Sequence, residues 1–440
     1  MRRVRTTREF RESLLRSRKV SSLSERREAE NQKLIQKTRA KRNISAPMGF
    51  GLPNKPESIR EHRAKSLRPI KTPKAHSQRA PLPPLQFVSF DEYRFSLPQI
   101  RVAHVIESLG MGGAQTMTFE LVNGLSGYYQ KDVSNTLVCV GRTPSSPSDF
   151  LRSYNLSAVH VQQSELQDWL SQNRINIAVH HRISQSRSIF HLMPPQTRYV
   201  LVNHTWNNLG SMSVFDNCDF YVSVCSFLHG KTRWHKAIHD SRRAVILNGV
   251  ENKYLESIKP TQFSGKFVTG RCHRLVTGKF RESSLSFLDH YVKPHIPGFQ
   301  HVILGSSPVL RGKTAKYSWL KCMGSVANRT KKMSAIKSFD AYFYDTYAHE
   351  GASIAVLESL ACGVPVICRP YGGNSELVKN GINGFVCQNQ DVAASKLRQL
   401  GNDPVLLGEM KDRVVKDFDN RLHIRHTASK YMQVFEHLLR

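Results

Sequence analysis

The stretch HEGASIAVLESLACGVPVICRPYGGNSEL, residues 349–377, sets two glutamates among small and apolar residues. It follows FDAYFYDT, which has the composition of a buried strand. We expect a helix to begin after Ser353 as its N-cap and to stop at Gly363. Glu350 would then lie in the loop at the end of the strand, and Glu358 on the helix. Because an unpaired buried carboxylate costs several kcal/mol, each acid needs donors, which either ligand hydroxyls or structural ion pairs would supply.

Short apolar, β-branched runs recur on both sides of this stretch and alternate with helix-like segments and turns. This pattern is typical of parallel sheets that are buried on both faces. It restarts after ILNGVE, so we predict an α/β fold with two Rossmann-like domains, over residues 99–246 and 247–422. In such sheets ligands bind outside the carboxyl ends of the strands. Two domains that face each other would therefore supply the two halves of one cleft.

The N-terminal 98 residues differ in composition from the rest of the chain. Residues 1–90 hold 23 Lys and Arg against 7 Asp and Glu, which is about half of the net charge of +30 carried by all 440 residues. They are polar and rich in Pro and Gly, so we predict a basic, mostly disordered tail over 1–98. A field of this sign concentrates polyanions, which include nucleic acid, anionic lipid and phosphorylated substrates. Charge alone does not choose among them.

The cysteines and the apolar runs bear on the compartment. The eight cysteines form no CxxC pair and mostly lie in apolar runs, which indicates buried, reduced thiols in a cytosolic protein. No apolar run approaches the roughly 18 residues that cross a bilayer. The first 19 residues carry charges every few positions, which is unlike a signal peptide. We expect a cytoplasmic protein, with peripheral attachment to the inner face of a membrane as an option.

A glycine cluster marks the first predicted domain. Gly110, Gly112 and Gly113 follow the strand-like RVAHVIE and precede a helix-like segment. Bare backbone N–H groups at a helix N-terminus can approach an anionic ligand. Gln115 occupies the sixth position, however, so the cluster departs from the G-x-G-x-x-G pattern of dinucleotide sites. A tight turn without any ligand is an equally good interpretation.

Extended to residue 386, the opening stretch resembles the signature of the retaining GT-B glycosyltransferases. It has an acid, seven residues, a second acid, a small-Gly-x-Pro-Val strand, a Gly-Gly-x-x-Glu loop and a Gly-x-x-Gly hairpin. ILNGVE resembles the interdomain crossing of that family, and RLVTGK (274–279) resembles its Arg-Leu-x-x-x-Lys element. The resemblance covers about residues 100–440. It implies a GT-B fold whose last segment, 423–440, is a helix that packs back on the first domain.

The resemblance implies a nucleotide-diphosphate sugar as donor and no obligatory metal. By residue, it implies that Glu350 contacts the transferred sugar and Glu358 the ribose hydroxyls. Arg274 and Lys279 would hold the diphosphate, where two cations suit a leaving pyrophosphate. Further implied contacts to sugar, phosphate or pocket come from His204 near the anomeric centre, Gly112, Gly113, Ser353, Ile354, Gly373 and Glu376. Arg271 is a rival to Arg274 as phosphate ligand.

The acceptor is open at this stage. One hypothesis is a glycan or lipid-linked acceptor, with the basic tail held against an anionic membrane surface. A second is glycosylation of modified bases of nucleic acid, such as viral DNA, with the tail attracted to phosphates. A third is that the tail docks the protein to a partner and that catalysis is secondary. The sequence leaves the sugar, the nucleotide base and the oligomeric state undetermined.

Two other patterns resemble metal sites only formally. Asp417 and Asp419 form a D-x-D pair, but they fall in a helix-like stretch, so we interpret them as surface acids. His180 and His181 end a strand on the side of the predicted cleft, where a ligand role is open. We interpret them as histidines without a metal, because no third ligand has a suitable spacing.

Overall fold

The structure is a computed structural model that describes residues 83–141, 149–181, 193–205, 218–232, 239–273, 275, 279–348 and 350–440. All of these belong to one unit, Thr72–Arg440. The predictions for residues 1–82 fall outside the described residues.

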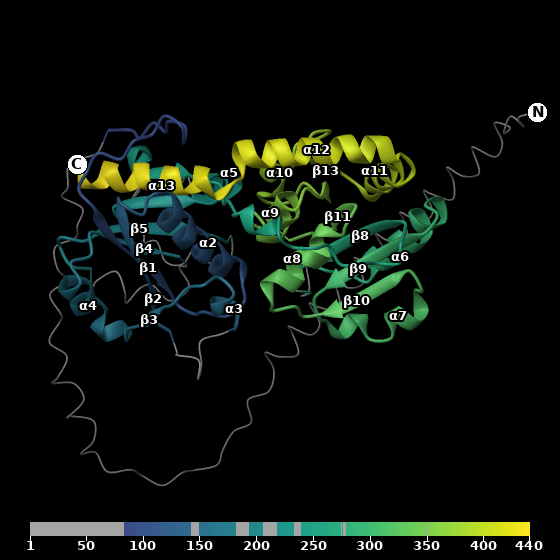
Figure 1. Ribbon diagram of the computed structural model, residues 1–440, viewed down its shortest axis with the longest axis horizontal. Helices are drawn as coiled ribbons and strands as arrows, with labels where there is room; N and C mark the ends of the chain where they lie inside the picture. Colours follow the sequence, from purple (N-terminus) through teal and green to yellow (C-terminus); the bar gives the residue numbers. More distant parts are fainter. Residues whose placement is uncertain are drawn as a thin grey trace, which may run out of the picture. The chain divides into compact units, whose positions relative to one another are not determined.

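The first half of the described chain forms a seven-stranded parallel sheet (Figure 1). Its strands, in spatial order, are β3 (Val159–His160), β2 (Val133–Cys139), β1 (Ile100–Ile106), β4 (Ile177–His180), β5 (Arg198–Asn203), β6 (Phe220–Ser223) and β7 (Arg243–Val245). The helices of this half are α2 (Gly113–Tyr128), α3 (Asp149–Arg152), α4 (Leu166–Gln172) and α5 (Ser226–Thr232). Every strand pairing is parallel, as the apolar runs predict.

The second half forms a six-stranded parallel sheet. In spatial order its strands are β10 (Leu320–Gly324), β9 (Phe299–Leu304), β8 (Phe267–Cys272), β11 (Ala341–Tyr344), β12 (Val366–Cys368) and β13 (Gly384–Val386). The helices of this half are α6 (Ser283–Tyr291), α7 (Lys313–Lys316), α8 (Arg329–Lys337), α9 (Ile354–Ala361), α10 (Asn374–Leu377), α11 (Gln390–Asn402) and α12 (Pro404–Arg421). The predicted fold class, two Rossmann-like sheets, is confirmed. We propose residues 99–246 and 247–422 as the domain bounds.

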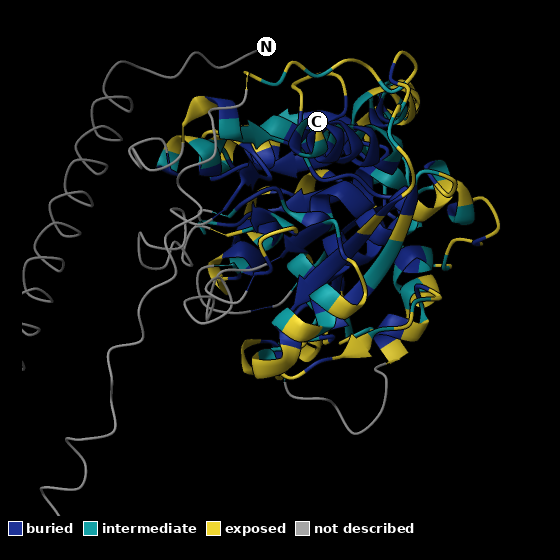
Figure 2. Cartoon of the chain, turned by 90° about the vertical axis from the view of Figure 1, so that its left-hand side faces the viewer, coloured by how far each residue is buried: buried dark blue, intermediate teal, exposed yellow. Residues whose placement is uncertain are grey.

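Burial of apolar side chains stabilises the strands of both sheets. All four residues of β4, β6 and β11 are buried, and Figure 2 shows the strands in dark blue inside the molecule. Fully buried apolar strands of this kind stabilise a sheet that helices cover on both faces. Among the described residues, none of the helices has the length and apolar character that crossing a membrane requires.

Helix α9 forms where the opening stretch predicts it. Ser353 is its N-cap, in extended conformation, and Gly363 follows its end with φ of 73°. Glycine suits this position because a side chain would strain a left-handed backbone. Asn374 Oδ1 accepts a hydrogen bond of 3.1 Å from the Ser353 N–H. The cap therefore connects α9 to the Gly-Gly-x-x-Glu loop.

The C-terminal helix α13 (Ile424–Leu439) packs on α2 of the first half. A Cβ built on Gly124 of α2 would lie 2.5 Å from Cγ1 of Ile424, so a side chain there would push the two helices apart. The N-terminal segment also contacts α13, because the Tyr93 hydroxyl donates to Glu436 at 2.8 Å. The last helix thus closes one face of the first sheet.

Glu251, at the crossing between the two halves, links α2 to the start of α13. Its Oε1 lies 3.1 Å from Nε2 of His423 and accepts a 2.9 Å hydrogen bond from the Lys253 N–H. The Tyr128 hydroxyl donates to its Oε2 at 3.1 Å. Burial raises the pKa of Glu251, but these hydrogen bonds outweigh burial and lower the pKa to about 2.

We therefore expect Glu251 to add stability that is complete above its ordinary pKa of 4.5 and is lost as the pH falls towards 2. In Glu251→Gln, the free energy of unfolding at pH 7 should drop by about 3 kcal/mol, and the difference from wild type should shrink to about 1 kcal/mol at pH 3. Urea unfolding at both pH values measures this. The exposed Glu256→Gln is the control, and an equal deficit at both pH values would contradict the prediction.

Candidate active site

Lys279 and Glu350 meet at the carboxyl ends of β8 and β11. Nζ of Lys279 forms an ion pair with Oε1 of Glu350, whose side chain is only 13% exposed. The Tyr344 hydroxyl donates a 2.6 Å hydrogen bond to Oε2 of the same carboxylate. Burial, together with this carboxylate, raises the pKa of Tyr344 well above its ordinary value, so the phenol stays a donor. The structure thus brings together one predicted phosphate ligand and the predicted sugar ligand.

Arg271 supports the loop that carries Lys279. Its guanidinium is fully buried, stacks on the Phe280 ring at 4.9 Å and donates to the Lys279 carbonyl oxygen at 2.9 Å. It also contacts Nε2 of His273 at 2.6 Å. Its donors are therefore directed at the loop itself. The side chain of Arg274 lies outside the described residues, so the rivalry between the two arginines stays a prediction.

Glu358, on α9, has a partner that the sequence reasoning missed. Its Oε1 accepts a 2.5 Å hydrogen bond from Nζ of Lys332 on α8, and both side chains are nearly buried. Burial lowers the pKa of Lys332, but the Glu358 carboxylate outweighs it and the net shift is upward. The predicted ribose ligand is therefore already held by a cation. Nothing in the linear spacing joins residues 332 and 358 before the fold is known.

A second buried ion pair links the two halves of the chain. Glu120 on α2 pairs with Arg329 on α8, and their side chains are 3% and 12% exposed. The Arg329 guanidinium lies 4.1 Å from the Tyr154 ring centre and 3.9 Å from that of Tyr254. The other carboxylate oxygen of Glu120 accepts a 3.1 Å hydrogen bond from the Glu251 N–H. This cluster was also missed, since its acid and its base are 209 residues apart.

The predicted first-half residues face the second half through close backbone approaches. Gly112 is the N-cap of α2, and a Cβ on Gly113 would lie 3.8 Å from Cγ1 of Ile354 on α9. A Cβ on Gly351 would lie 2.7 Å from the carbonyl oxygen of His204. His204 therefore lies beside the loop that carries Glu350. The glycine cluster and the first-half histidine thus approach the same end of α9.

The Gly-Gly-x-x-Glu loop also joins the two halves. The Glu376 carboxylate accepts hydrogen bonds from the N–H groups of Ser226 at 2.7 Å and Phe227 at 2.9 Å, at the start of α5. The Gly373 N–H donates to the Glu350 carbonyl oxygen at 3.0 Å. A Cβ on Gly373 would lie 2.6 Å from Sγ of Cys225, so this position has room only for glycine. In this structure both predicted residues brace the loop.

The two formal metal patterns have other partners. Asp417 accepts from Arg421, and Asp419 accepts from Arg425. Nδ1 of His180 lies 2.9 Å from the Tyr199 hydroxyl. Within the described ranges, no cluster of three or more His, Cys, Asp or Glu side chains is placed to hold a metal ion.

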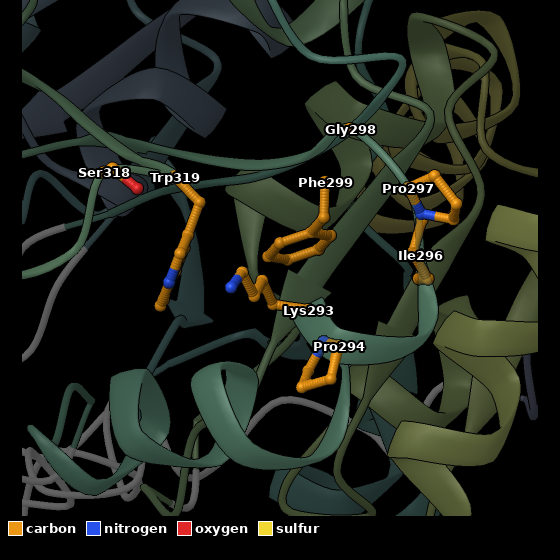
Figure 3. A pocket seen from close by; sticks show the side chains of 8 residues that line it. All are labelled: Lys293, Pro294, Ile296, Pro297, Gly298, Phe299, Ser318 and Trp319. Carbon is orange, nitrogen blue, oxygen red and sulfur yellow. The ribbon is translucent and has the colours of Figure 1, made fainter.

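A surface hollow lies elsewhere in the second half (Figure 3). Gly298 and Phe299 line it at the start of β9, with Ser318 and Trp319 just before β10. These are the amino ends of the strands, whereas Lys279 and Glu350 follow carboxyl ends. Ligands of open parallel sheets bind at the carboxyl ends, so the hollow is not part of the candidate site.

Sequence comparison finds a match to a known family within the second half. Residues 294–417 match the family described as glycosyl transferases group 1. A stretch of 114 residues, 25% of this chain, is 23% identical to an uncharacterized glycosyltransferase of Methanocaldococcus jannaschii. That stretch spans 28% of the relative's length.

Solved structures share the architecture over most of the chain. A glycosyltransferase from Rickettsia africae superposes with a TM-score of 0.64 at 13% identity, over 78% of this chain and 99% of that one. HepE of Anabaena, in complex with UDP, superposes with a TM-score of 0.60 at 14% identity, over 76% of this chain and 99% of its own. The chain therefore has the GT-B fold, and its residues 294–417 match the family described as glycosyl transferases group 1.

Proposed function

We propose that this protein is a retaining glycosyltransferase that moves a sugar from a nucleotide-diphosphate sugar to a glycan or lipid-linked acceptor. The ion pair between Lys279 and Glu350, beside the His204 backbone, carries the proposal. In this pair Lys279 is a cation that can bind phosphate and Glu350 is an acid that can bind sugar hydroxyls. Both lie at the carboxyl ends of strands of a parallel sheet, where such folds bind ligands. The group 1 match over 294–417 and the UDP bound by the similar HepE support the donor class.

In the donor complex, Lys279 leaves Glu350 for the diphosphate, and Glu350 then accepts hydrogen bonds from the sugar. Charge on the leaving nucleoside diphosphate grows as the bond between the anomeric carbon and the phosphate oxygen breaks, so a fixed cation stabilises the transition state more than the ground state. Arg274 is the second proposed phosphate ligand. Backbone N–H groups at Ser353 and Ile354, at the N-terminus of α9, add a favourable dipole.

The nucleoside half of the donor meets Glu358. Its carboxylate is paired with Lys332, so the ribose hydroxyls compete with an ammonium group for the acid. Gly112 and Gly113 approach the donor from the first half, whereas Gly373 and Glu376 hold the loop that closes the pocket. Arg271 contributes by fixing the Lys279 loop. The acceptor hydroxyl is deprotonated with help from the leaving phosphate, on the face from which that phosphate departs.

A donor screen on the full chain tests this function. We expect one uridine-diphosphate sugar, or one sugar of another nucleoside diphosphate, to raise the Tm. A ligand that binds only the folded state adds stability, by about 2.7 kcal/mol at a concentration of 100 times its Kd. The same donor should be hydrolysed slowly or transferred. If no nucleotide sugar raises the Tm and none is consumed, the proposal fails.

The acceptor is tested separately, with the donor that the screen selects. Transfer to lipid-linked or free glycans is the expected result. Transfer to modified bases of DNA is the rival outcome, and its loss on removal of the basic tail 1–98 would assign phosphate attraction to that tail. If the tail binds a partner while donor turnover stays negligible, docking rather than catalysis is the main activity.

A further inference from the structure

Three histidines of the first sheet form a hydrogen-bonded chain that leads to the candidate site. Nε2 of His104 on β1 lies 3.1 Å from Oδ1 of Asn135, and its Nδ1 lies 3.1 Å from Nε2 of His181. Nδ1 of His181 lies 3.4 Å from Nε2 of His204. His104 and His181 are completely buried. The chain thus runs from β2 to the residue whose backbone adjoins Gly351.

The end of the chain at Asn135 fixes the direction of every bond. The Asn135 amide group donates to Oγ of Ser126 at 3.2 Å, so its carbonyl oxygen faces His104. A carbonyl oxygen only accepts, and Nε2 of His104 must therefore carry a proton. Burial lowers the pKa of His104 to about 4, so the ring is neutral near pH 7 and its Nδ1 is an acceptor.

The same logic passes along the chain. Because Nδ1 of His104 accepts, Nε2 of His181 must donate. Burial lowers the pKa of His181 well below its ordinary value, so this ring is also neutral and its Nδ1 accepts. Nε2 of His204 then has to donate to it. The orientation of the Asn135 amide thus determines the tautomer at the end of the chain.

We propose that Asn135, His104 and His181 act as positioning residues that hold His204 in its Nε2–H tautomer and fix the orientation of its ring. This rests on the proposed function, in which His204 lies near the anomeric centre. In neutral His204 the other ring nitrogen, Nδ1, has a lone pair and no proton. It accepts a hydrogen bond from a sugar or acceptor hydroxyl and cannot donate one.

The hydrogen-bonded chain of histidines selects one tautomer of His204 but does not conduct protons away from it. Asn135 has no proton to release from its carbonyl and no site to take one up, so it ends the chain. A buried polar chain of this kind is satisfied only in one arrangement, because the alternative tautomer of His204 would leave one contact of the chain with two acceptors and no proton. The hydrogen-bonded chain therefore predicts a single tautomer of His204, which nitrogen NMR can observe and which packing alone would not determine.

Nitrogen NMR on the full chain with ¹⁵N-labelled histidine tests the proposal, with His204→Gln used to assign the His204 signals. We expect the unliganded protein to show the Nε2–H form of His204 near pH 7. Asn135→Leu, which removes the acceptor at similar size, should give a mixture of both tautomers. Asn135→Asp, which keeps an acceptor at the same place, should restore the single form. Tyr199→Phe, which removes the neighbouring hydrogen bond to His180, is the matched control and should change nothing at His204.

Kinetics separate this proposal from the proposed function. In Asn135→Leu we expect kcat for transfer to fall about tenfold with an unchanged KM for the donor, and Asn135→Asp to recover most of it. An Nδ1–H form of His204 in the wild type, or a single unchanged form in Asn135→Leu, would overturn the positioning chain. The predicted tautomers without any sugar transfer would instead refute the proposed function and leave the chain standing.

Discussion

Lys279→Ala is expected to lower kcat/KM for the proposed sugar transfer by at least about 100-fold, because it removes the cation that we propose for the leaving diphosphate. In the free protein the same change leaves Glu350 with the Tyr344 hydroxyl as its side-chain donor among the described residues. The Glu350 side chain is largely buried, so Lys279→Ala leaves a buried carboxylate without this cation. Lys279→Ala should therefore weaken both the contact of the protein to the diphosphate and the contact of Glu350 to the sugar.

The measurement is steady-state transfer with the donor that thermal shift selects, together with the Tm of each variant. Lys313→Ala is the control, since Lys313 forms an ion pair with Glu282 outside the candidate site and its loss should leave kcat/KM within about twofold. Wild-type turnover in Lys279→Ala would remove this lysine from the diphosphate site. A large loss in Arg274→Ala or Arg271→Ala would then reassign the phosphate contact.

Glu120→Ala is expected to lower the free energy of unfolding by about 3–5 kcal/mol, because it leaves Arg329 buried without its carboxylate. Burial lowers the pKa of Arg329, but Glu120 outweighs burial and raises it, so the guanidinium is charged in the folded protein. The two tyrosine rings beside it cannot replace a full negative charge. The variant also leaves the Glu251 N–H without this acceptor.

Urea denaturation at neutral pH measures this loss, and two further variants interpret it. The exposed pair Arg413 and Glu409 is the control, and Glu409→Ala should change the free energy of unfolding by less than about 1 kcal/mol. The double variant Glu120→Leu with Arg329→Met should recover most of the stability, since apolar residues of similar volume remove the buried charge. A loss in Glu120→Ala no larger than in Glu409→Ala would show that Arg329 is solvated.

Local pattern was enough to predict the fold class and the helix after Ser353. Strands that are buried on both faces have continuous apolar sequences, so they can be recognised from the sequence. The end of the helix at Gly363 could be predicted because glycine readily adopts the left-handed backbone found there. Lys279 and Glu350 were assigned to one donor site only through resemblance to a family, and their ion pair was not predicted. Spacing alone left ion pairs and ligand contacts equally open for both glutamates.

The partners of Glu358 and Glu120 could not be predicted from the sequence, because each pair forms between different helices. Lys332 and Arg329 lie in NRTKK, a run that resembles any solvated basic face until α8 is packed against its neighbours. The acceptor role of Asn135 was missed for a similar reason. A single polar residue on a strand gives no signal until the adjacent strand brings His104 beside it.

The start of α5 depends on an acid from the other half of the chain. The Glu376 carboxylate accepts hydrogen bonds from the N–H groups of Ser226 and Phe227, so the first turn of this helix is capped by a charged residue of the other half. Separation of the two halves would either expose those donors to water or carry α5 along with the Gly-Gly-x-x-Glu loop. The order of a first-half helix and the spacing of the two halves are thus thermodynamically linked, and amide exchange at Ser226 and Phe227 reports directly on how often the halves part.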